Sequence, residues 1–139
     1  MPAPHPVVGS WKVAVSVPGA PARTINIARL SLDGGVVVTF PSPTPAPPGA
    51  NHAMEFWTPA IGAWTAAVDR DATMTFVALG VNERGAPVGA HTVSATVTAA
   101  ADGLSWQGPF QIEITSGDGA SVGKVQGTVA ATPITAKGA

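Results

Sequence analysis

Cysteine and tyrosine are both absent from this 139-residue chain. Without cysteine, the chain can form no disulfide, thiolate metal site or thiol nucleophile. Without tyrosine, it has no phenolic acid. The sequence also lacks a P-loop, a dinucleotide-binding fingerprint, a Gly-x-Ser-x-Gly elbow and a His-Glu-x-x-His zinc motif. We therefore expect no cofactor and no metal.

Charge is scarce as well. Seven Lys and Arg residues stand against eight Asp and Glu residues, and charged residues make up 11% of the chain, where about a quarter is usual. No basic stripe is visible, so we expect no nucleic-acid partner. Few charges leave the edges of a flat sheet open to pairing with another chain. A closed barrel or an oligomer, such as a homodimer, would remove those edges.

Long apolar runs are missing too. None approaches the roughly 20 residues of a membrane helix, and Met1 to His5 form a proline-rich start without an apolar signal core. We expect a cytoplasmic protein without a membrane partner. The length fits one domain, 1–139, with a flexible N-terminal tail over 1–7 and a C-terminal tail over 134–139.

The residues that are abundant alternate. Val, Thr and Ile dominate runs in which apolar and small polar residues alternate, and turn signals such as Asp33-Gly34-Gly35 separate the runs. Strands are predicted at 8–17, 23–32, 35–41, 52–57, 61–69, 72–82, 88–100, 104–116 and 121–132. So many hairpin-linked strands favour closure. The sequence predicts an all-β fold, a single antiparallel up-and-down β-barrel of eight or nine strands.

One segment breaks this rhythm. Residues 41–50 read PSPTPAPPGA. Because proline lacks an amide hydrogen, the run is predicted to stay out of the sheet as an extended loop. It joins two strands and must then cross one end of the barrel, either as a stiff connection or as a lid over the mouth.

The alternation also assigns the inner face. Many inward residues are predicted to be small, and they include Ala28, Gly62, Ala78, Ala95, Gly108, Gly127 and Ala131. An eight-stranded barrel can be filled by its side chains or can hold one small ligand. Small inward residues favour the ligand, whereas the four Trp and four Phe residues could fill the space instead.

The first predicted strand carries a family resemblance. Gly9-Ser10-Trp11 resembles the Gly-x-Trp signature of lipocalins and the wider calycin group. The resemblance implies a lipocalin-like barrel whose bottom is closed by Trp11. The basic residue that lipocalins pair with this Trp is missing near the C-terminus, where Thr132-Pro133-Ile134 stands.

A second resemblance involves Gly62-Ala63-Trp64 and Phe76-Val77-Ala78-Leu79. These motifs are similar to those of a group of small bacterial proteins. Their general shape resembles allene oxide cyclase-type barrels, some of which cyclise apolar polyketide or lipid substrates. This likeness implies a cyclase or isomerase activity as an alternative to binding alone.

Few residues could carry chemistry. His52 and Glu55 follow the proline-rich run and precede Trp57. They would face opposite ways on a strand and share a face on a helical turn. They are candidates for a base and an acid at the mouth, with Trp57 as a wall, or else for a polar strand start.

His91 has inward parity beside Val93. It is a candidate polar handle or proton carrier inside a cavity, or else a satisfied core histidine. His52, Glu55 and His91 could together bind a divalent metal, but their spacing specifies no site. His5 lies in the predicted tail and is set aside.

Further candidates could contact a ligand. Asn26 and Arg29 lie on opposite faces of one strand, and either could contact a ligand carbonyl or carboxylate. The remaining candidate wall residues are aromatic: Trp64, Phe76, Trp106 and Phe110. The leading hypothesis is a barrel that binds a small apolar molecule. The alternatives are a cofactor-independent cyclase or isomerase acting on an apolar substrate, and a filled structural barrel.

Overall fold

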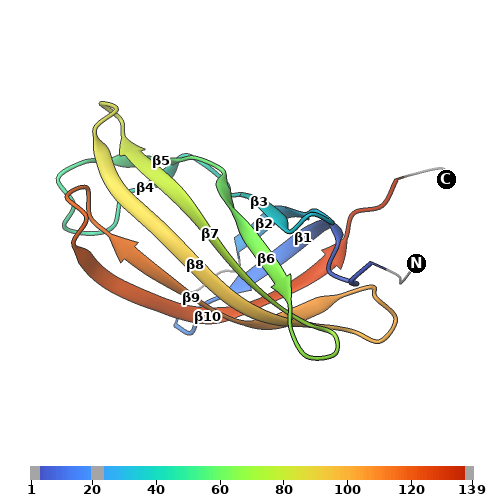
Figure 1. Cartoon of the computed structure of the whole chain (residues 1–139). Coiled ribbons are helices and arrows are strands. Elements are labelled where there is room, and N and C mark those ends of the chain that lie inside the picture. The colour runs from blue at the N-terminus through green and yellow to red at the C-terminus, as the bar shows by residue number, and fades with distance from the viewer. Residues whose placement is uncertain (1–3, 20–23, 137–139) are drawn as a thin grey trace.

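A computed structural model describes residues 4–19 and 24–136. In these ranges the chain is entirely β-structure and turns, without a helix. Eight strands close into one antiparallel barrel and two short strands lie outside it (Figure 1). The predicted all-β, up-and-down barrel is therefore confirmed. The described ranges include no helix of the length and apolarity needed to cross a membrane.

The barrel strands follow the predicted runs closely. They are β1 (Gly9–Ser16), β2 (Thr24–Leu30), β3 (Gly35–Thr39), β6 (Ala60–Ala66), β7 (Asp71–Asn82), β8 (Pro87–Ala99), β9 (Trp106–Thr115) and β10 (Ser121–Pro133). Each pairs with its neighbours in the chain, apart from the β3–β6 step around the insertion. Pairing of β1 with β10 closes the barrel, with Trp11 opposite Pro133.

The outside strands are β4 (Thr44–Pro45) and β5 (Met54–Trp57). β4 pairs only with β5, through Thr44 opposite Glu55. The expectation that the proline-rich run stays out of the sheet is thus wrong at Pro45. An edge strand tolerates proline because one of its sides needs no amide donor.

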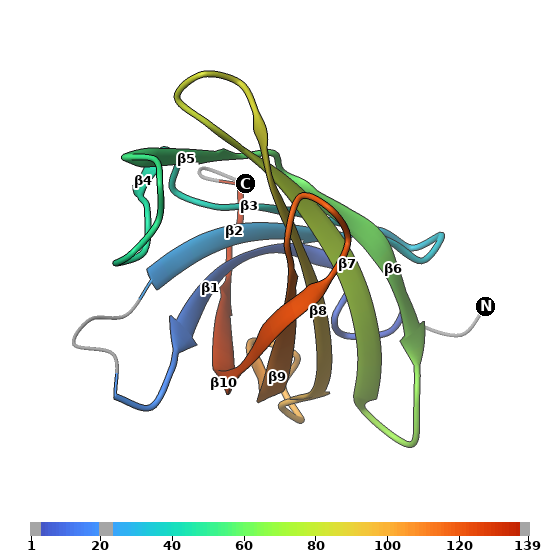
Figure 2. The same cartoon turned by 90° about the vertical axis from the view of Figure 1, so that its left-hand side faces the viewer.

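β5 and β6 both pair with β7, but the two pairings are in different registers. Trp57 of β5 lies opposite Gly80, and Ile61 of β6 lies opposite Val77. The register changes by one residue across the Thr58-Pro59 step, where β5 leaves the barrel wall. β5 therefore extends the wall beside the far end of β7 (Figure 2).

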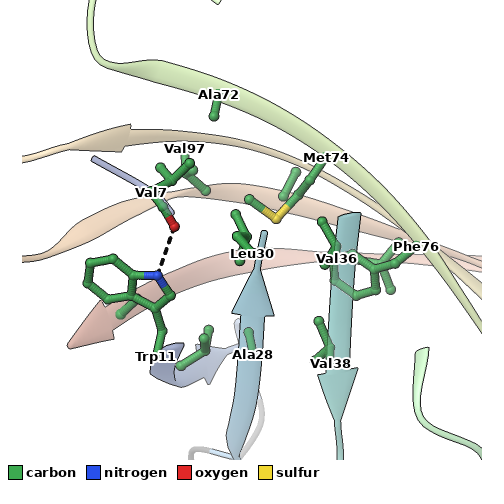
Figure 3. Packing of buried hydrophobic residues seen from close by; sticks show 14 of the residues in the cluster. Val7, Trp11, Ala28, Leu30, Val36, Val38, Ala72, Met74, Phe76 and Val97 are labelled. Atoms are coloured by element: carbon green, nitrogen blue, oxygen red, sulfur yellow. Dashed lines mark hydrogen bonds between the residues drawn. The ribbon is translucent and has the colours of Figure 1, made fainter. Parts of the chain in front are cut away.

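One end of the barrel is packed shut. Residues 4–8 lie across it, Val7 is fully buried, and the Trp11 Nε1–H donates to the Val7 carbonyl oxygen at 2.9 Å (Figure 3). The ring of Trp106 meets Trp11 edge-on, with centroids 5.7 Å apart. Trp11 thus fills this "closed end", where residues 4–8 and 134–136 also lie (Figure 1). The closed end includes part of the predicted N-terminal tail.

The opposite end is less densely covered. On the side formed by β1, β9 and β10, the inward-facing apolar residues towards this end are only half-buried, whereas Ala78 of β7 and the residues nearer Trp11 are buried. The half-buried set is Val15, Val17, Ile112, Ile114 and Val125. Solvent therefore reaches the inner wall at this "open end", the end that faces the viewer in Figure 2.

Candidate functional site

Two aromatic rings meet at the open end. The indole of Trp57 stacks on the imidazole of His91, with centroids 3.9 Å apart and planes 23° from parallel. Trp57 comes from β5, outside the barrel, and His91 comes from the inner face of β8, opposite Ala78 of β7. The stack thus joins the added strand to the barrel wall.

His52 and Glu55 complete this group. His52 Nε2 lies 2.8 Å from Glu55 Oε2, and both side chains are largely buried. The Trp57 Nε1–H donates to Glu55 Oε1 at 3.3 Å. His52 lies in a bend and Glu55 in β5. Because the two residues are not on one continuous strand, their side chains can lie on the same side. We call His52, Glu55, Trp57 and His91 the mouth cluster.

A glycine makes room for the stack. A Cβ added to Gly80 of β7 would lie 2.8 Å from the Trp57 ring. Any larger residue would push the indole away from β7. The sequence does carry a signal here, because an inward glycine between Ala78 and Asn82 in a strand often marks a close approach.

A carboxylate holds β5 in place from outside. Glu83, in the β7–β8 turn, accepts hydrogen bonds from the backbone N–H groups of Ala53 and Met54 at 3.1 and 3.2 Å. Backbone hydrogen bonds to the carboxylate, from its own amide and from these two, lower the pKa of Glu83 to about 2. Sequence reasoning missed this contact, since it joins residues about thirty positions apart.

The imidazole of His91 is partly shielded from water. Burial lowers the pKa of its imidazole below 6.5, and the negative charge of Glu55 partly offsets the shift. Its ring is therefore mostly neutral at pH 7 and can accept a proton. The three titratable candidates of the sequence analysis thus lie in one group. The described residues nevertheless include no set of three or more His, Asp or Glu side chains that could hold a metal ion.

Asn26 lies on the inner face of β2, opposite Val13 of β1. Its residue surface is 9% exposed, and its Oδ1 is buried without a hydrogen-bond partner among the described residues. β2 and β8 are on opposite sides of the barrel, because three strands separate them in either direction. Asn26 and His91 therefore project from facing walls.

The other predicted wall residues are spread along the barrel. Phe76 and Phe110 are buried core residues, with Phe110 packed over Gly127. Trp106 is buried at the closed end. Its Nε1 also has no partner in the described ranges.

Two further candidates are away from the mouth cluster. Trp64 donates to the Ser31 carbonyl oxygen and lies 5.5 Å from the ring of His5, which is held at the closed end through Asp71. Arg29 is exposed on the outer face and donates to the Ser10 hydroxyl at 3.1 Å. Neither residue is brought to the mouth cluster.

Comparison of the chain with family models, curated proteins and solved structures finds no match. The mouth cluster and the inner wall are therefore the features of the molecule that indicate a function.

Proposed function

We propose that this protein binds a small apolar molecule in the open half of its barrel. The observation that carries the proposal is the half-buried apolar inner wall of β1, β9 and β10, at the same end of the barrel as the Trp57–His91 stack. Apolar side chains that water can reach gain free energy when a ligand covers them, at about 25 cal/mol per Å².

The composition of this region supports the proposal. Val15, Val17, Ile112 and Val125 line the wall, and the mouth cluster supplies a few polar groups at one side. Ligand sites typically combine a mainly apolar lining with a few placed polar groups. We also propose that the barrel is lipocalin-like. The position of Trp11 across the closed end supports this likeness.

A second candidate function is a cofactor-independent cyclase or isomerase acting on an apolar substrate. The 2.8 Å contact between His52 and Glu55, next to a largely neutral His91, favours it. A neutral imidazole could take a proton while the His52–Glu55 pair supplies one. The barrel wall would hold the substrate in a reactive shape.

The binding proposal is tested with prodan, an uncharged apolar dye whose emission reports a dry environment. Wild-type protein should bind prodan with a blue shift and quenching of tryptophan emission. Trp57→Ala should weaken binding by about 1–3 kcal/mol, because a large contact surface is lost. Phe56→Ala is the matched control, since Phe56 is the neighbouring aromatic on β5 and is 41% exposed.

Two results would refute the proposal. One is a failure of prodan to bind wild-type protein, and the other is equal affinity of prodan for Trp57→Ala and wild type. The enzyme candidate needs a separate measurement, in which apolar compounds retained by the native protein are incubated with it and examined for isomers by mass spectrometry and chromatography. Conversion that His91→Gln abolishes would favour the enzyme over a simple binder.

A further inference from the structure

The Oδ1 atom of Asn26 is a buried acceptor without a hydrogen-bond donor among the described residues. It lies on the inner wall at the last buried position of β2 towards the open end. A buried polar atom left without a partner costs about 1–3 kcal/mol. A leucine of similar size at this position would avoid that cost. A donor that arrives from outside the chain would remove this cost.

We propose that Asn26 is the polar anchor of the ligand, and that the ligand class is a small apolar molecule with one hydroxyl or N–H group. Its donor would bind Asn26 Oδ1, and its apolar body would extend towards the wall that carries Trp57 and His91. This inference depends on the proposed binding function and narrows its ligand. An acceptor-only molecule or a pure hydrocarbon would leave Asn26 Oδ1 unpaired.

The test compares three ligands in displacement of prodan. They are 2-naphthol, which has a donor, 2-methoxynaphthalene, which has only an acceptor, and naphthalene. Wild type should prefer 2-naphthol over both others by about 3- to 10-fold, the range of one neutral hydrogen bond. Asn26→Leu should lose this preference while still binding naphthalene. Its Tm should be unchanged or higher, because an unpaired buried group has been removed.

The outcomes separate the two proposals. Equal affinities for the three compounds in wild type, or a preference that survives in Asn26→Leu, overturn the anchor and leave the binding proposal standing. A lowered Tm in Asn26→Leu also overturns it, since the side chain would then have a structural partner. If prodan itself does not bind wild type, both proposals fail.

A second inference comes from the outer surface. Val37, Ile61 and Val77 are direct cross-strand neighbours on β3, β6 and β7, and all three point outward. Further exposed apolar residues lie near this row, and the exposed Arg29 of β2 is the direct neighbour of Val37 at its end. The "outer apolar face" consists of Ile25, Ile27, Val37, Phe56, Ile61, Val77 and Leu79, exposed by 40% to 68%.

The size and chemistry of this face suit a second copy of the chain. Its seven residues expose roughly 600 Å², which is most of the ~800 Å² that each partner buries in a standard interface. None of the seven carries a charge, and the exposed cations Lys12 and Arg29 border the face on β1 and β2. The outward β-branched side chains of these strands can pack against those of a second copy, as the faces of two sheets do in sandwiches. We infer that the outer apolar face forms an isologous homodimer interface.

Sedimentation velocity over a range of concentrations tests this inference. Wild type should sediment as a dimer, at twice the 13.8 kDa chain mass. Ile61→Lys should be monomeric with an unchanged prodan affinity. Thr96→Lys is the matched control on the exposed outer face of β8 and should stay dimeric. A monomeric wild type, or a dimer that Ile61→Lys leaves intact, would overturn the inference and leave this face to a different partner.

Discussion

The imidazole of His91 is covered by the indole of Trp57 at a centroid distance of 3.9 Å. The two residues are 34 positions apart in the sequence, and one of them lies on a strand outside the barrel. Their stack keeps water from one face of the imidazole, so burial lowers the pKa of His91. The position of Trp57 therefore contributes to the burial of the His91 imidazole.

The first prediction concerns pH and stability. Because the folded-state pKa of His91 lies below its ordinary 6.5, the unfolded chain takes up this proton more readily. His91 therefore reduces the free energy of unfolding as the pH falls below about 6.5, until the folded state is also protonated. Urea titrations between about pH 7.5 and pH 5.5 should show a smaller decline for His91→Gln than for wild type. Identical declines would contradict the assignment.

The second prediction concerns the closed end. Trp11→Ala should lower the free energy of unfolding by about 3–5 kcal/mol, because it leaves a large cavity among buried side chains. Trp11→Phe should cost less, since it keeps most of the packing and loses the hydrogen bond to Val7. Lys12→Ala, on the outer face of β1, should change stability by no more than about 0.5 kcal/mol. Urea unfolding of the three variants checks this order.

The fold could be predicted because almost every strand obeys one simple pattern. In β8, for example, Val93, Ala95 and Val97 are buried while Ser94 and Thr96 are exposed, so the sequence itself states which face points inward. The break between β5 and β6 could not be foreseen. It depends on a one-residue change of register at the Thr58-Pro59 step, which alternation alone does not reveal.

The candidate site was predictable only in part. Parity placed His91 on the inner face and Asn26 and Arg29 on opposite faces, with either as a ligand contact, but it gives no height along the barrel axis. Height depends on how the strands tilt and stagger. For this reason Trp64 and Trp106, which also have inward parity, lie at the closed end rather than in the mouth cluster. The contact between His52 and Glu55 requires the bend at 51–53. The sequence does not reveal this bend, because long-range contacts such as the hydrogen bond from the Ala53 amide to Glu83 stabilise it.

The third prediction concerns that contact. With a pKa of about 2, Glu83 should hold the Ala53 and Met54 amides well below the pH at which an ordinary carboxylate is protonated. The ionised carboxylate stabilises the folded state fully above pH 4.5, and this stabilisation is lost as the pH falls towards 2. The NMR shifts of both amides should titrate with a midpoint near 2 and become insensitive to pH in Glu83→Gln. Asp102→Asn, a turn carboxylate bonded to Leu104, should leave them unchanged. A midpoint near 4.5 in wild type would contradict the contact.

The last prediction concerns Gly80, which lies beneath Trp57. A Cβ at this position would lie 2.8 Å from the indole, so Gly80→Ala should push Trp57 off His91. The imidazole would then regain water, and its pKa should rise towards 6.5, since burial is the main cause that lowers it. Prodan affinity should fall together with the near-ultraviolet circular dichroism of the stacked indole. Gly123→Ala is the matched control, because a Cβ there would have no atom within 4 Å. NMR titration of the His91 ring decides the matter: if its pKa stays unchanged in Gly80→Ala while Trp57 moves, the stack is not what keeps His91 neutral.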